Sequence, residues 1–248
     1  DHPDDGEVIG AVLIQVPQWV SATTPAGRPF TVVTANLYFG HADVTALAAL
    51  AADAEVLSLQ EVTPDALARI RASPIARRLP YEYAVPADGA GGAVIRGRAP
   101  FTDQHLVPNT TFAHVAATTA VPGVAAVRVI AAHPVAPLGH RGRMWGADLR
   151  ALRTYLASVP PGPVIVAGDF NATTDHAQYR ALLGNGFADA GEQSGAGFVP
   201  TFPTNRLGGR PIVALDHVVS RGFVAARLRT VTLPGSDHRA VVVSLVAS

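Results

Sequence analysis

The segment at residues 164–171 constrains the fold of this chain more than any other. Residues 164–167 are all apolar and predict a buried strand. Gly168 then lets the backbone turn closely, so that Asp169 and Asn171 follow at the carboxyl end of the strand. Two residues apart on an extended segment, these side chains point the same way and suit one polar site beyond a sheet. Asp and Asn are also ordinary turn residues, so this segment alone leaves a purely structural role open.

Polar side chains also stand at the ends of other apolar runs. A chain that only needed turns there would use Gly, Pro and Ser, whereas these ends carry carboxylates, amides and imidazoles. The runs and their polar neighbours are 31–35 with Asn36, 56–59 with Gln60 and Glu61, 127–132 with His133, 212–215 with Asp216 and His217, and 240–246, which Asp237 and His238 precede. The pattern favours one polar site built from several strand ends.

Helical and extended patterns alternate along the chain. Asp43 is a suitable N-cap for a helix over residues 44–52. Between two strands, this helix predicts a βαβ unit that brings Asn36 and Glu61 to the same sheet edge. The other predicted elements are a helix opening at residues 63–65, strands at 81–85 and 92–95, two strands within 110–132, a helix at 145–156, a short helix after 175, and a surface loop at 184–201.

Composition narrows the possible chemistry. With 248 residues, 48% of them hydrophobic, we expect an N-terminal segment and linker at residues 1–28 and a single catalytic domain at residues 29–248. The absence of cysteine excludes disulfides, thiol catalysis and sulfur-ligated metals. The formal net charge is +0 and every basic residue is Arg, so no broad cationic field is expected. This argues against a processive nucleic-acid enzyme, which needs many phosphate contacts.

Six of these short motifs carry a resemblance to a known family. They are residues 34–37, 59–62, the strand end at His133, and residues 168–171, 215–217 and 236–238. In this order they resemble the endonuclease/exonuclease/phosphatase superfamily, the deoxyribonuclease-I-like metal-dependent phosphoesterases, over about residues 29 to 247. The resemblance implies an α/β fold, a four-layer α/β/β/α sandwich with two packed mixed β-sheets.

The resemblance also implies a site for a divalent cation. Glu61 is the expected ligand, because its hard carboxylate oxygens suit Mg²⁺ or Mn²⁺. Asn36 is expected to support the same ion directly or through water, and Asp237 to contact it from a second side.

The remaining motif residues are expected to act on the substrate and the attacking water. His238 is the expected general base, oriented by Asp216, while Asp169 positions or deprotonates the water. Which of Asp169 and His238 takes the proton stays open. Asn171 and His133 are expected to grip the phosphoryl oxygens, although the residues around His133 depart from the family pattern.

Residues outside the motifs received other interpretations. We expect Arg143, with His140, to lie on the substrate side. We expect His217 and the remaining histidines to be structural or surface residues.

These expectations support a phosphodiesterase or phosphatase that acts on a lipid headgroup or cell-envelope substrate by in-line attack of water. An extracellular Mg²⁺-dependent nuclease is the alternative, although the charge does not favour nucleic acid. A third hypothesis, from another class, is a non-catalytic binding module on the same fold. We expect the protein to be a monomer.

The N-terminal region leads to a hypothesis about location. Met144 is the only methionine, so we expect a region upstream of Asp1. Residues 8–16 are apolar but too short to span a bilayer, and they are open to interpretation as an early strand, a membrane-proximal remnant or a loose terminus. The sequence resembles actinobacterial members that are exported and tethered by N-terminal helices. This favours an extracellular or cell-surface location over a cytoplasmic one.

Overall fold

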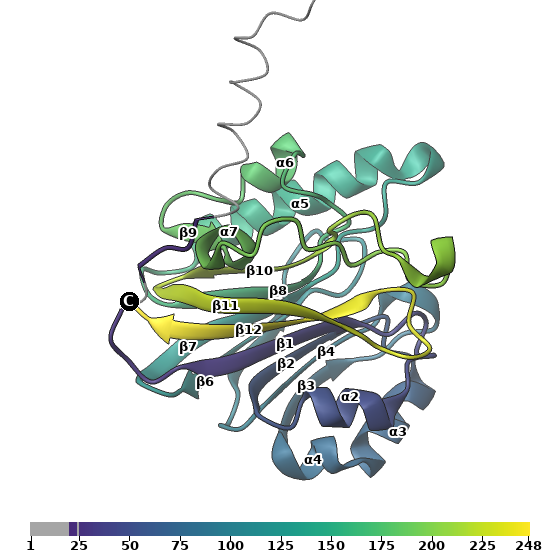
Figure 1. Cartoon of the computed structure of the whole chain (residues 1–248), viewed down its shortest axis with the longest axis horizontal. Coiled ribbons are helices and arrows are strands. Elements are labelled where there is room, and N and C mark those ends of the chain that lie inside the picture. Colours follow the sequence, from purple (N-terminus) through teal and green to yellow (C-terminus); the bar gives the residue numbers. More distant parts are fainter. Residues whose placement is uncertain (1–19, 24) are drawn as a thin grey trace, which may run out of the picture.

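Two six-stranded sheets pack face to face in the computed structural model, which describes residues 20–23 and 25–248 (Figure 1). The strand orders are β11-β12-β1-β2-β4-β3 and β5-β6-β7-β8-β10-β9. Both sheets are mixed, since β1 pairs with β2 and β7 with β8 in parallel, while the other neighbours are antiparallel. The predicted four-layer α/β/β/α sandwich is confirmed.

The elements have the following bounds. The strands are β1 Phe30–Asn36, β2 Ala54–Gln60, β3 Tyr81–Val85, β4 Ala93–Gly97, β5 Thr102–Leu106, β6 Val115–Val121, β7 Val124–Ala132, β8 Val164–Asp169, β9 Phe187–Asp189, β10 Asp216–Arg221, β11 Phe223–Thr232 and β12 Arg239–Ala247. The helices are α2 Val44–Leu50, α3 Pro64–Ala72, α4 Pro74–Arg78, α5 Gly142–Ser158, α6 Ala177–Arg180 and α7 Ala190–Ser194, with short 3-10 turns at Gly89–Gly91, Gly139–Arg141 and Leu207–Gly209.

Apolar side chains form three layers of core. One cluster fills the space between the sheets, where Val32 and Ile165 are buried. A second lies under α2, α3 and α4 on the outer face of the first sheet, and a third lies under α5 and α6 on the outer face of the second (Figure 1). Helix α5 buries Trp145, Leu149, Leu152 and Leu156, whose spacing of three or four residues makes one apolar stripe.

Strand direction gathers the predicted polar residues at one edge of the sandwich. The parallel strands β1 and β2 end together, and so do β7 and β8. Strands β10 and β12 run antiparallel to β8 and β1, so their first residues lie at the same edge. In register, Asp216 at the start of β10 stands opposite Asp169 at the end of β8.

Two secondary-structure predictions were wrong. The segment 184–201 is not simply a surface loop, because it contains β9 and α7, with Asp189 as the N-cap of α7. The run 212–215 is not a strand; only Val213 forms a bridge, to Phe202, and the strand begins at Asp216. Strands β5 and β11 were not predicted, because both are edge strands with many exposed side chains that weaken the apolar pattern.

The interpretation of residues 8–16 lies outside the described residues. Within residues 20–23 and 25–248, no helix has the length and apolar character needed to cross a membrane.

A buried polar cluster of Tyr179, Asp189 and His217 joins α6, β9, α7 and β10. The Tyr179 hydroxyl donates to Asp189 Oδ2 at 2.5 Å, and His217 Nδ1 lies 3.0 Å from the same oxygen. Burial lowers the pKa of His217, but the hydrogen bond and charge of Asp189 outweigh it and raise the pKa above its ordinary value of 6.5. Burial raises the pKa of Asp189, but the hydrogen bond and charge of His217 reverse this and bring it below 3.8. Between pH 3.8 and 6.5 the two groups therefore form a buried ion pair.

Gly168 is expected to be essential for stability. It stands opposite Ala132 in the β7–β8 pair, and a Cβ there would lie 1.9 Å from the Ala132 carbonyl oxygen. We predict that Gly168→Ala lowers the free energy of unfolding by about 3 kcal/mol, because the backbones must separate. Urea denaturation measures this. The control is Gly142→Ala in α5, where an added Cβ would meet no described atom within 4 Å other than its chain neighbours and the backbone of its own helix. Similar unfolding midpoints for the two variants would contradict the prediction.

Stability should depend on pH through His217 and Asp189. The raised pKa of His217 contributes stability below its ordinary value of 6.5, and this is lost as pH rises through the folded value. The lowered pKa of Asp189 contributes stability above 3.8, and this is lost as pH falls through the folded value. Between pH 3.8 and 6.5, the free energy of unfolding of the wild type should therefore be about 3 kcal/mol larger than that of His217→Gln. The difference should be smaller at lower and at higher pH. Urea denaturation across pH is the measurement, and a gap that widens above 6.5 would refute the assignment.

Candidate active site

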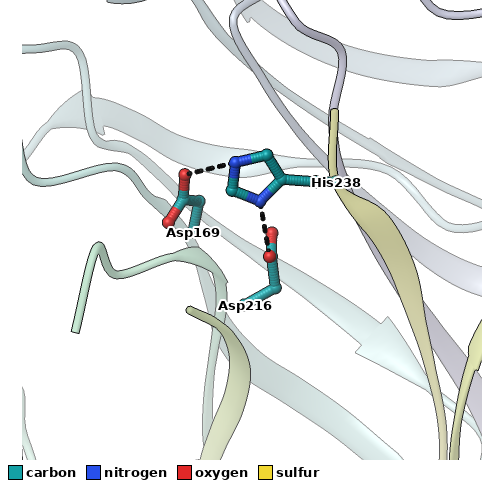
Figure 2. Close-up of side chains that lie close together, drawn as sticks. All are labelled: Asp169, Asp216 and His238. Carbon is teal, nitrogen blue, oxygen red and sulfur yellow. Dashed lines mark hydrogen bonds and ion pairs between the residues drawn. The ribbon is translucent and has the colours of Figure 1, made fainter. Parts of the chain in front are cut away.

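The centre of the site is a chain of three side chains, Asp216, His238 and Asp169. His238 Nδ1 lies 2.7 Å from Asp216 Oδ2, which is a short hydrogen bond. On the other side of the ring, Nε2 lies 3.7 Å from Asp169 Oδ2, which is too long for a direct hydrogen bond. Figure 2 shows the imidazole between the two carboxylates. A polar gap of this kind at the end of a strand suits a water molecule shared by His238 and Asp169.

A second imidazole faces the same carboxylate. His133 follows β7, and its Nε2 lies 3.6 Å from Asp169 Oδ2 and 3.9 Å from Glu61 Oε1. The ring of Phe112 packs against it at 5.2 Å between centroids. Although the sequence around His133 departs from the family pattern, the fold brings this side chain to the predicted site.

Asn36 and Glu61 meet at the ends of β1 and β2. The Asn36 amide donates from Nδ2 to Glu61 Oε1 at 3.1 Å and to Asp169 Oδ2 at 3.0 Å, while Oδ1 accepts from the Tyr38 backbone N–H at 2.9 Å. The other Glu61 oxygen accepts from the Phe39 backbone N–H at 2.7 Å. Asn36 therefore turns its nitrogen, not its oxygen, toward the carboxylates and orients them.

Backbone strain is concentrated at these residues. Glu61 and Asn171 have φ values of 57° and 48°, and Tyr38 and Phe39 have 48° and 52°. Non-glycine residues seldom adopt this conformation, which costs about 1 kcal/mol or more each. The side-chain hydrogen bonds to Glu61 and a hydrogen bond from the Asn171 N–H to Asp169 Oδ1 at 2.8 Å hold these conformations in place.

Burial and mutual charge shift the pKa values of the site. Burial lowers the pKa of His238, but the charges of Asp216 and Asp169 outweigh it and raise the pKa to about 10. Burial raises the pKa of Asp169, an effect that the charge of His238 opposes. Burial also raises the pKa of Asp237, and with the charge of Glu61 the value reaches about 6. The site thus concentrates negative charge that a cation would offset.

Sequence reasoning missed the segment that joins Asp216 to His238. The Thr201 hydroxyl accepts from the Leu215 and Asp216 N–H groups at 3.1 and 3.3 Å, and the Thr201 carbonyl accepts from the Arg239 N–H at 2.8 Å. The adjacent Phe202 ring packs on the His238 imidazole at 4.8 Å between centroids. These contacts join segments far apart in the chain, so no local pattern reveals them.

Two further side chains fix the site from outside the motifs. The hydroxyl of Ser236 donates to the Asn36 carbonyl at 2.7 Å and accepts from the His238 N–H at 3.0 Å, which ties the His238 turn to β1. Buried Asp148 accepts from the Val135 N–H at 3.0 Å and so anchors the loop after His133. The Ser236 motif gave a signal in the sequence, whereas Asp148 in the middle of a helix did not.

The donor set fits a hard divalent cation. Glu61 and Asp237 both supply carboxylate oxygens, and Asp237 lies near enough for the charge of Glu61 to raise its pKa. Carboxylate oxygens are the ligands that Mg²⁺ and Mn²⁺ prefer. Asp169, Asp216 and His238 also have ligand atoms within 4.8 Å of one another. Because His238 Nδ1 is already hydrogen-bonded to Asp216 Oδ2, this trio is better suited to moving a proton than to enclosing a cation.

Most predicted site residues lie at this edge, but Arg143 does not join the cluster. Asn171 donates from Nδ2 to the Pro134 carbonyl at 3.0 Å, which holds its turn against the loop after His133. Arg143 is exposed in the first turn of α5, at the end of that loop. Among the described residues, no side-chain hydrogen bond or ion pair links it to the other candidates.

Solved structures share this fold at low sequence identity. D. rerio TDP2 humanized by mutation is 17% identical with a TM-score of 0.72, over 88% of this chain and 98% of that one. An endonuclease/exonuclease/phosphatase from Beutenbergia cavernae DSM 12333 is 20% identical with a TM-score of 0.70, over 89% and 72%. Sphingomyelinase C from Streptomyces griseocarneus is 18% identical with a TM-score of 0.60, over 88% and 99%.

The sequence comparisons give the family. A search of curated proteins finds no match. Residues 33–238, which include all the motif residues from Asn36 to His238, match the Endonuclease/Exonuclease/phosphatase family. The chain therefore belongs to the Endonuclease/Exonuclease/phosphatase family and is a divalent-metal-dependent hydrolase of phosphoester bonds.

Proposed function

We propose that the chain hydrolyses a phosphodiester by in-line attack of a water held between Asp169 and His238. The observation that carries this is the Asp216–His238–Asp169 chain, with its 3.7 Å gap between Nε2 and Oδ2. A water in this gap can donate a proton to Asp169 Oδ2, while His238 Nε2, which the raised pKa of about 10 keeps protonated, donates to the water. Because the two groups are coupled, the proton taken from the water belongs to the Asp169–His238 pair rather than to one residue. Asp216 holds the imidazole and stabilises its cationic form.

Other side chains bind the phosphate and the cation. His133 and Asn171 hold the phosphoryl oxygens as charge develops on them. Glu61 and Asp237 hold the cation, and Asn36 orients Glu61. When bound, Mg²⁺ or Mn²⁺ offsets the negative charge of the phosphoryl group and of the leaving oxygen. We favour Mg²⁺, because the ligands are oxygens from few side chains.

We propose a phospholipid headgroup or a cell-envelope phosphodiester as the substrate. Three loops leave the site, and each exposes an apolar side chain: Phe39 beside Glu61, Leu138 after His133, and Leu207 after Phe202, with 42%, 73% and 59% of their surfaces exposed. Exposed arginines accompany them, at Arg141, Arg143, Arg206 and Arg210. Apolar groups with basic neighbours suit contact with a lipid surface. One of the similar structures is a sphingomyelinase C.

A nuclease is the alternative. A similar structure is D. rerio TDP2 complexed with single strand DNA product, and the loop arginines could meet a short phosphate backbone. The formal net charge of +0 and the absence of Lys argue against a long nucleic-acid substrate. A non-catalytic binding module on this fold is the third candidate. Hydrolysis of bis-p-nitrophenyl phosphate separates it from both enzymes.

We propose that the protein works as a monomer outside the cell or at its surface, tethered through a region upstream of Asp1. The apolar loops support only the contact with a membrane surface, since a lipid surface is their proposed partner. Fractionation of cells that express the full-length gene tests the location, and a wholly cytoplasmic product would refute it.

Removal of the acid-base pair should abolish turnover without unfolding the protein. We predict that His238→Ala and Asp169→Asn each lower kcat on bis-p-nitrophenyl phosphate with Mg²⁺ by about 100-fold or more, because each removes a transition-state role. The assay is steady-state kinetics with and without chelator. His105→Ala, on the edge strand β5, is the matched control and should keep wild-type kcat. Wild-type turnover in either site variant would overturn the mechanism.

The substrate class should follow the apolar loops. We predict that Leu138→Asp and Leu207→Asp lower hydrolysis of sphingomyelin and phosphatidylcholine vesicles by about 10-fold, because an added charge opposes contact with lipid. Turnover of soluble bis-p-nitrophenyl phosphate should not change. Tyr81→Asp is the control, since Tyr81 is 40% exposed but stands in register with the start of β2, at the opposite end of the sheet. Cleavage of single-stranded DNA that falls steeply between about 50 and 200 mM salt would favour the nuclease instead.

A further inference from the structure

His217 has hydrogen-bond acceptors at both ring nitrogens. Its Nδ1 lies 3.0 Å from Asp189 Oδ2, and its Nε2 lies 2.9 Å from the Ala172 carbonyl oxygen and 3.3 Å from the Ala214 carbonyl oxygen. A carbonyl oxygen only accepts, so Nε2 must carry a proton. The side chain is 6% exposed, which leaves water little access to replace these partners.

The state of Asp189 fixes the other nitrogen. Besides His217, its carboxylate accepts from the Tyr179 hydroxyl at 2.5 Å and from the Gly191 and Glu192 N–H groups at 2.7 and 3.2 Å. A carboxylate that accepts from all these donors is ionised. His217 Nδ1 therefore donates as well, and His217 is an imidazolium with both nitrogens protonated.

The two carbonyl groups belong to turns that carry the site. Ala172 follows Asn171 directly on the turn after β8, and Ala214 lies two residues before Asp216. A backbone hydrogen bond from the Phe170 N–H to the Leu215 carbonyl at 2.8 Å joins the same turns. One buried proton donor thus fixes the distance between the residue proposed to hold the phosphate and the residue that orients the base.

We propose that His217 is a positioning residue for catalysis, which acts by clamping the Ala172 and Ala214 carbonyls with Nε2–H. The inference rests on the proposed function only for its effect on turnover. The hydrogen bond between Nδ1 and Asp189 has a different role, which is to keep the imidazole protonated and in position. The two nitrogens can therefore be tested separately.

Two amide substitutions separate the two hydrogen bonds. In His217→Gln the amide nitrogen can reach the position of Nε2 and keep the clamp, whereas in His217→Asn it reaches only the position of Nδ1 and keeps the contact with Asp189. Both variants lose the positive charge, so both lose stability. We expect His217→Asn to lower kcat on bis-p-nitrophenyl phosphate by about 10-fold or more with little change in KM, and His217→Gln to stay within about threefold.

The matched control is Tyr179→Phe, which removes a hydrogen bond to Asp189 without touching the clamp. It should lose stability yet keep kcat within about threefold of wild type. Equal kcat losses in His217→Gln and His217→Asn, or a loss in Tyr179→Phe as large as in His217→Asn, would overturn the proposal and leave only a structural role.

Nuclear magnetic resonance gives a readout that does not need turnover. In the wild type at neutral pH, nitrogen-15 spectra should show both nitrogens of His217 protonated; a ring without a proton on Nε2 would overturn the proposal. The proton on His238 Nδ1, which lies in the hydrogen bond to Asp216, should have its wild-type chemical shift in His217→Gln. In His217→Asn the chemical shift of this proton should change. If the wild type hydrolyses nothing, the proposed function fails, while this pair of spectra still decides whether His217 positions Asp216.

Discussion

The main constraint on the site is electrostatic repulsion, because the strand ends bring several carboxylates together where they are buried. Asp169 and Asp216 face each other across β8 and β10, and only the imidazole of His238 separates their charges. The raised pKa of Asp169 and the value of about 6 for Asp237 follow from burial and, to a smaller extent, from this crowding. A bound divalent cation would relieve the repulsion, which explains why a hydrolase of this kind needs one.

Such a cluster persists only because the surrounding structure holds it. Gly168 allows β7 and β8 to approach closely enough for His133 and Asp169 to meet. The strained conformations of Glu61 and Asn171 are fixed by hydrogen bonds from their neighbours. Behind the site, the Nε2–H group of His217 donates to the Ala172 and Ala214 carbonyls, which belong to two of the turns. The stability of the two sheets therefore offsets the cost of the strained conformations and of the crowded charges.

The sequence predicted the parts of this arrangement that local patterns encode. Apolar runs that end in polar residues located β1, β2, β7 and β8, and the family motifs predicted which side chains meet at their ends. Contacts between distant segments could not be predicted from local patterns. The Thr201 hydroxyl accepts from the Asp216 N–H, and Asp148 accepts from the Val135 N–H, only in the folded chain. The segment 184–201 was misread because its strand and helix are short and lie among glycines, so turn signals hid Asp189.

The most direct measurement is calorimetric titration of Mn²⁺ into the wild type, Glu61→Gln and Glu55→Gln. Glu61 follows β2 at the site, whereas Glu55 lies near the other end of the same strand and pairs with Arg98. One cation site at the strand ends predicts saturable binding that weakens by about 10-fold or more in Glu61→Gln and is unchanged in Glu55→Gln. Wild-type affinity in Glu61→Gln, or equal weakening in both variants, would contradict it.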